Sequence, residues 1–287
     1  DADFSVLGEG EETILDLVKA LEQGKPFQQI SGIGYFEQGK FVQNGLGREV
    51  KNLDSLPFPD FEGFGFGKHL DSLNSSDIFF FDVFDFPREY SLVSARSCPL
   101  SCTFCYHPTK YRQRSLDSVF QELSIVVPKY RINIISIMDD LFSVKENRVL
   151  EFCQRVKSLA KTISWELKWF CQMKVGDLSP GVLQKMKDAG CFMISYGLES
   201  FSPEVLKSMK KSITPDQIQK SIKLTMEHGI SIQGNFIFGD REETIETVKT
   251  TLEFWKENLE AGINLGYIML LPNSELYQYA VQTGAIK

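Results

Sequence analysis

Strand-like apolar segments alternate with helical segments through residues 90–287 of this 287-residue chain. Each strand and its following helix take about 33 residues, a length typical of βαβ units. Strands joined by crossover helices run parallel with right-handed connections, so the pattern restricts the fold to a doubly wound α/β sheet or a barrel. Periodicity alone leaves both architectures open. The expected strands are 90–95, 132–138, 165–173, 191–196, 231–238 and 263–271, and the expected helices are 116–127, 144–159, 182–189, 203–209, 215–228, 243–255 and 275–281.

Composition narrows the class of protein. Hydrophobic residues make up 43% of the chain, enough to fill a sizeable core. The sequence has no run of about 18 apolar residues and no apolar segment at its start, so we expect no membrane span, no export and a cytoplasmic location. The net charge of -7 provides no attraction for a polyanion, which disfavours a nucleic-acid substrate and favours a small molecule.

Three of the six cysteines, Cys98, Cys102 and Cys105, lie within eight residues in a C-x3-C-x2-C pattern. In a reducing compartment such closely spaced thiols are more often metal-binding or catalytic than disulfide-bonded. A structural zinc site closes with four protein ligands, so three thiolates suit a 4Fe-4S cluster with one iron open to a non-protein ligand. Two alternatives remain: a zinc site completed by His107, and three free buried thiols.

The segment from Cys98 to Cys105, with the aromatic Phe104 before its last cysteine, resembles the signature of the radical S-adenosylmethionine (radical SAM) enzymes. The resemblance implies a 4Fe-4S cluster on Cys98, Cys102 and Cys105, with SAM chelated by the open iron and Phe104 beside the adenosine. It also implies reductive cleavage of SAM to a 5′-deoxyadenosyl radical, with a flavodoxin or ferredoxin as electron donor. The implied fold is a six-stranded (β/α)6 partial TIM-like barrel whose cluster loop follows the first strand.

Two acidic residues, Asp139 and Asp140, follow the second expected strand. In parallel α/β folds ligands sit at the carboxyl ends of the strands. The next helix has its own capping box in Ser143 and Glu146, which leaves both aspartates without a capping role. The resemblance implies that one of the pair contacts SAM or the substrate.

Polar residues on three later strands are further candidates for cofactor binding. Glu199 comes shortly after the fourth expected strand, and the next helix can start at Pro203 without it. The segment 197–200 resembles the family's fourth-strand motif, which implies that Glu199 contacts SAM. Gln172, among apolar neighbours on the third strand, suits core hydrogen bonding and SAM contact equally well. Asn235 lies on the fifth strand, where the resemblance implies contact with the adenosine.

Residues 1–36 are predicted to form a strand, a helix and a strand, as the remnant of a Rossmann-like α/β domain cut from something longer. We expect the glutamates of the turn 9–12 to cap the helix, because they would repel a phosphate. The segment resembles the tail of the cobalamin-binding domain that precedes the core in one radical SAM subgroup. That subgroup contains methyltransferases and anaerobic ring cyclases. Cobalamin is implied only for a longer parent chain, since no histidine here lies in a D-x-H-x-x-G motif.

Residues 37–89 are predicted to be a linker rich in phenylalanine, proline and glycine, ahead of the core at 90–287. Its phenylalanines, including those at 79–81, are expected to pack against the barrel wall, and the alternative is that they line the mouth of the substrate site. Cys153, Cys171 and Cys191 lie singly in a helix and two strands, so we expect inert buried thiols without a close cysteine partner.

The sequence therefore predicts a radical SAM enzyme, with methyl transfer or ring cyclisation of a small molecule as the expected outcome. Two alternatives from other classes stay open. A radical SAM methylthiotransferase or other RNA-modifying enzyme would need a basic surface or an added RNA-binding domain. A non-enzymatic zinc-binding module would use Cys98, Cys102, Cys105 and His107.

Overall fold

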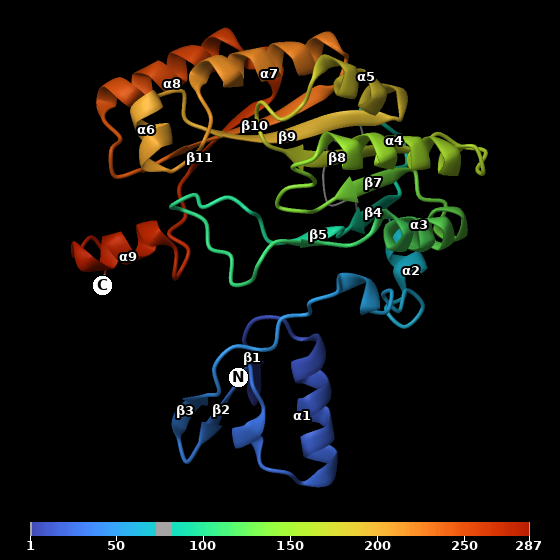
Figure 1. Cartoon of the computed structure of the whole chain (residues 1–287), viewed down its shortest axis with the longest axis vertical. Helices are drawn as coiled ribbons and strands as arrows, with labels where there is room; N and C mark the ends of the chain where they lie inside the picture. Colours follow the sequence, from blue (N-terminus) through green and yellow to red (C-terminus); the bar gives the residue numbers. More distant parts are fainter. Residues whose placement is uncertain (1, 73–81, 287) are drawn as a thin grey trace.

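The computed structural model describes residues 2–72 and 82–286. Its largest part is a six-stranded parallel sheet whose strands follow one another in chain order from one edge to the other (Figure 1). A doubly wound sheet reverses its strand order at a switch point, so this order confirms the α/β partial barrel. The strands are β4 (Glu89–Leu92), β7 (Ile134–Ile137), β8 (Lys168–Met173), β9 (Cys191–Glu199), β10 (Ser231–Phe238) and β11 (Ile263–Tyr267), and a short antiparallel ladder pairs β5 (Ala95–Arg96) with β6 (Arg112–Gln113).

Helices cover the outer face of this sheet (Figure 1). The first of them shows why: Leu116, Val119 and Leu123 recur at helical spacing and are all buried. This helix continues beyond its expected end at residue 127, because Pro128 falls in the last turn and removes only one hydrogen bond. These helices are α3 (Leu116–Tyr130), α4 (Glu146–Ala160), α5 (Pro180–Asp188), α6 (Pro203–Ser208), α7 (Pro215–Glu227) and α8 (Ile245–Glu257). The last helix, α9 (Glu275–Gln282), lies apart from them (Figure 1).

The N-terminal unit, residues 2–43, is a separate layer built from β1 (Phe4–Val6), α1 (Glu11–Gln23), β2 (Ile33–Glu37) and β3 (Lys40–Gln43) (Figure 1). The order of strand, helix and strand is as expected. However, β2 runs antiparallel to both β1 and β3, whereas the strands of a Rossmann-like βαβ unit are parallel. The second strand starts only at residue 33, because residues 27–29 form a 3-10 turn, and it turns back directly into β3.

Charged residues connect the N-terminal unit to the β5–β6 ladder. The Glu9 side chain is only 8% exposed and pairs with Arg112 and with Arg96, while the Val50 amide donates to its Oε2 at 2.6 Å. Arg96 also pairs with Glu11. The N-cap of α1 is Gly10, which no side chain caps. Glu9 therefore links two parts of the chain instead of capping the helix.

We expect this link to make stability depend on pH in acid. Burial opposes ionisation of Glu9, but Arg112, the Val50 amide and Arg96 outweigh it and lower the pKa of Glu9 to about 2 from an ordinary 4.5. A depressed carboxyl pKa stabilises the fold above the unfolded value, and this stability is lost as the pH falls from about 4.5 towards 2. Chemical denaturation should show a smaller loss over this window for Glu9→Gln than for the wild type. Equal losses would contradict the assignment.

Several phenylalanines in the described part of the linker pack on the barrel, among them Phe84 against Ile134, Phe170 and Met193. Phe61 and Phe66 lie against Tyr90 and Tyr130, with ring centroids 5.1–6.0 Å apart. They follow the expectation for this segment, but Phe64 is 86% exposed. The phenylalanines at 79–81 lie outside the described residues, so their packing stays a prediction. None of the helices that the structure describes is long and apolar enough to cross a membrane.

Candidate cluster and cosubstrate site

The cysteine loop, residues 97–111, leaves the carboxyl end of the sheet after β4 and is closed at its base by the β5–β6 ladder. Ser97 has a φ of 66°, a left-handed conformation that is uncommon for a residue with a side chain and turns the chain sharply just before Cys98. The middle of the loop is held at Thr103, whose amide donates to the Met209 carbonyl at 3.0 Å and whose carbonyl accepts from the Leu276 amide at 2.8 Å. The loop is thereby fixed at both its base and its centre.

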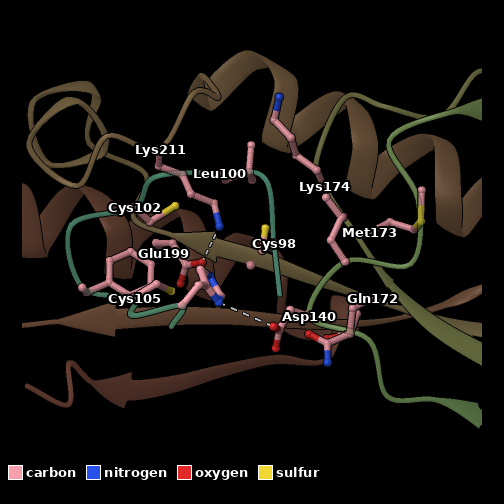
Figure 2. A pocket seen from close by; sticks show the side chains of 15 residues that line it. Cys98, Leu100, Cys102, Cys105, Asp140, Gln172, Met173, Lys174, Glu199 and Lys211 are labelled. Atoms are coloured by element: carbon pink, nitrogen blue, oxygen red, sulfur yellow. Dashed lines mark hydrogen bonds and ion pairs between the residues drawn. The ribbon is translucent and has the colours of Figure 1, made fainter. Parts of the chain in front are cut away.

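The three thiols of this loop line one pocket of about 230 Å³ (Figure 2). All three cysteines are free. Their pKa values are raised mainly by burial, and that of Cys105 reaches about 12. Neighbouring acidic groups and thiols raise them further. A bound metal cation would stabilise the thiolate form of these crowded groups, because a thiol binds a metal in its deprotonated form.

An ion pair lies beside the thiols in the same pocket. Lys211 Nζ lies 2.6 Å from Glu199 Oε1, and the two side chains are 12% and 9% exposed (Figure 2). Burial works against the charged form of Lys211, but the Glu199 carboxylate outweighs it and raises the pKa of the lysine. Glu199 has a φ of 62° at the end of β9, a strained conformation of the kind found at functional sites. A Cβ at Gly197 would lie 2.3 Å from Glu199 Oε1, so only glycine there leaves room for the pair.

The expected cofactor contacts divide into two groups. Phe104, Asp140 and Gln172 lie in the pocket with the thiols and with Glu199. Asp139 does not face the same way: it is 1% exposed, and its carboxylate accepts hydrogen bonds from Ser94 and Ala95. Of the two aspartates, only Asp140 therefore stays a predicted cosubstrate contact. Asn235 lies on β10, where its side-chain oxygen is 3.4 Å from Asn264 Nδ2.

The positions of the possible metal ligands test the alternative of a zinc site completed by His107. A zinc ion binds every donor at about 2.0–2.3 Å, so its ligands must converge on one point. Within residues 2–72 and 82–286, no three His, Cys, Asp or Glu side chains converge in this way. The His107 ring instead faces Asp140, with Nδ1 3.6 Å from Oδ2. A cluster distributes three thiolates over three irons and does not require such convergence.

Residues 92–254 match the family model of the radical SAM superfamily. The chain belongs to this superfamily. The uncharacterized methyltransferase PH0819 of Pyrococcus horikoshii is 31% identical over 97% of this radical SAM chain and 58% of that protein. The anaerobic magnesium-protoporphyrin IX monomethyl ester cyclase of Rubrivivax gelatinosus is 25% identical, over 96% of the chain and 48% of the cyclase. The chain thus spans about half the length of these curated relatives.

A solved structure supports the same fold. The radical S-adenosylmethionine methyltransferase TsrM from Kitasatospora setae, with cobalamin and a [4Fe-4S] cluster bound, matches 99% of this chain and 54% of TsrM. The TM-score is 0.75 at 18% identity, which shows a shared architecture. Membership of the superfamily gives this chain a 4Fe-4S cluster and SAM as cofactors. The pocket fits both, because its three free thiols would hold the cluster and the charged pair of Lys211 and Glu199 lies in the same pocket.

One feature of the site and one of the core escaped sequence reasoning. Lys211 follows α6 and lies 12 residues after Glu199, away from any strand end, so no spacing pointed to it. The buried cysteines expected to lie singly are neighbours instead: burial and a hydrogen bond with Cys191 raise the pKa of Cys171, and Cys153 on α4 is close to both. The pairing of β8 with β9 brings Cys171 and Cys191 together, and this pairing cannot be read from the sequence.

Proposed function

We propose that this chain is the catalytic core of a radical SAM enzyme that cleaves SAM reductively to a 5′-deoxyadenosyl radical. The observation that supports the proposal is the shared pocket, in which three free cysteines face a buried lysine–glutamate pair. When bound, the cluster supplies the electron that splits the sulfonium, and the protein supplies placement and exclusion of water.

Roles follow for the residues of the pocket. Cys98, Cys102 and Cys105 would hold the cluster. The Lys211 ammonium is suited to the carboxylate of SAM, because it keeps its charge in a buried site. Glu199 neutralises the lysine and can accept from the amino group, and Phe104 offers an aromatic face for the adenine. These assignments extend to Asp140 and Gln172, which lie in the same pocket, and to Asn235 as an adenosine contact on β10.

The relatives support a finer proposal. Because they include a methyltransferase and an anaerobic cyclase, we propose that the whole protein transfers a methyl group to an unreactive centre or closes a ring on a small molecule. Residues 1–36 would be the remnant of a cobalamin-binding-like domain, residues 37–89 the linker and residues 90–287 the core. In support, a second pocket of about 400 Å³ lies between the Gly8–Glu9 turn and the cysteine loop and includes Cys105. A flavodoxin or ferredoxin in the cytoplasm would supply the electron.

Anaerobic reconstitution tests this function. After incubation with iron and sulfide, the protein should bind four irons per chain. It should also absorb visible light and release 5′-deoxyadenosine from SAM once reduced. The same preparation without reductant is the control. A colourless protein that carries one zinc and does not cleave SAM would replace this proposal with the zinc-binding module.

A further inference from the structure

Asp139 occupies a place in the fold that neither a cap nor a cosubstrate contact explains. It follows β7 at the carboxyl end of the sheet and is 1% exposed. Its Oδ1 accepts from the Ser94 amide at 2.7 Å and the Ala95 amide at 2.8 Å, and its Oδ2 accepts from Ser94 Oγ at 2.5 Å. All three donors lie in the segment that joins β4 to the cysteine loop.

This segment is where both ends of the cysteine loop meet the sheet. The Ser94 carbonyl accepts from the Arg114 amide at 2.9 Å, so the chain that leaves the loop is tied to the residue through which it enters. Arg148 from α4 reinforces the junction, since its Nη1 donates to the Arg114 carbonyl at 3.0 Å and its Nη2 lies 3.4 Å from Ser94 Oγ. Asp139 connects this junction to β7.

A carboxylate has a specific advantage at this position. It offers two acceptor oxygens and no donor, so it can satisfy two backbone amides and a hydroxyl together. An asparagine offers one acceptor oxygen, and its NH₂ group would replace the other. Burying a carboxylate is costly unless it is fully hydrogen-bonded, which indicates that these three contacts are its role. Asp140, by contrast, is 55% exposed at its side chain and lies in the pocket.

We propose that Asp139 is a positioning residue, which fixes the cysteine loop to the sheet through Ser94 and Ala95 so that Cys98 is presented to the cluster. The effect on the cluster rests on the proposed function. The effect on the loop backbone does not, because it is present in the protein without a metal.

Hydrogen exchange of the apo protein tests the role in the loop. In Asp139→Asn, amide exchange in the peptide covering residues 94–98 should be at least about tenfold faster than in the wild type, because hydrogen bonds to a charged group are lost. Asp140→Asn is the matched control and should leave exchange in this peptide unchanged. Ser94→Ala removes only the hydroxyl contact, so it should give a smaller increase in the same peptide and replaces Asp139→Asn if that variant does not fold.

Reconstitution then separates this inference from the proposed function. Asp139→Asn should bind less iron per chain than the wild type under identical conditions, and its remaining cluster should give a broadened electron paramagnetic resonance signal. Wild-type exchange in residues 94–98 together with weakened SAM binding would overturn the positioning role and make Asp139 a SAM contact. If the wild type itself forms no cluster, the proposed function fails, while the exchange result still decides what Asp139 does.

Discussion

Cys102→Ala should abolish both cluster formation and SAM cleavage, the largest loss expected of any single substitution in this chain. Cys102 lines the pocket together with Cys98 and Cys105, and the described residues bring no further cysteine into that pocket. A cluster left with two protein ligands has two open irons and is not held in place. We expect visible absorption and 5′-deoxyadenosine release to fall to the background of the assay.

The matched control is Cys153→Ala, in which the same substitution is made at a buried position of helix α4. Cys153 is 3% exposed on α4, in contact with the core and not with the cysteine loop. Its loss removes one sulfur and leaves a small cavity, so we expect a modest fall in stability of about 1 kcal/mol and normal cluster content. Equal loss of the cluster from both variants would show that the three loop cysteines are not its ligands.

The sequence allowed the fold of the core to be predicted for a simple physical reason. Buried parallel strands and amphipathic helices carry different apolar periods, and these periods are local. The position of the cysteine loop followed from the same alternation, since the three cysteines come directly after the first strand. The choice of a barrel over a doubly wound sheet did not follow from periodicity, because strand order is a long-range property; it came from family resemblance and is confirmed by the order of the strands.

The features that could not be predicted depend on side-chain directions and on distances between segments that are far apart in the sequence. Asp139 and Asp140 are neighbours, yet one faces the junction at Ser94 and the other faces the pocket. Both lie in the loop after β7, where no strand alternation fixes the direction of a side chain, so the sequence pattern cannot separate them. The antiparallel direction of β2 was missed for a related reason, because strand direction is decided by the loop and packing between two strands.

The Glu199–Lys211 pair should give the largest effect on SAM binding among residues that are not cluster ligands. Lys211→Met leaves the Glu199 carboxylate buried without its partner, which costs about 3–5 kcal/mol of folding free energy. It also removes the buried positive charge that we assign to the SAM carboxylate. We expect a lower midpoint of chemical denaturation and weaker binding of SAM to the reconstituted protein, measured by equilibrium dialysis.

The double variant Glu199→Gln with Lys211→Met separates stability from binding. It leaves no uncompensated charge in the pocket, so folding free energy should return most of the way to that of the wild type. SAM binding should stay weak, because neither charged group is restored. Lys210→Met is the matched control: Lys210 is 52% exposed and pairs with Glu275 in solvent, so its loss should cost less than about 1 kcal/mol and leave SAM binding intact. Normal SAM affinity in the double variant would show that the pair maintains the fold of β9 and takes no part in binding, since the buried charges would then be dispensable for the cosubstrate.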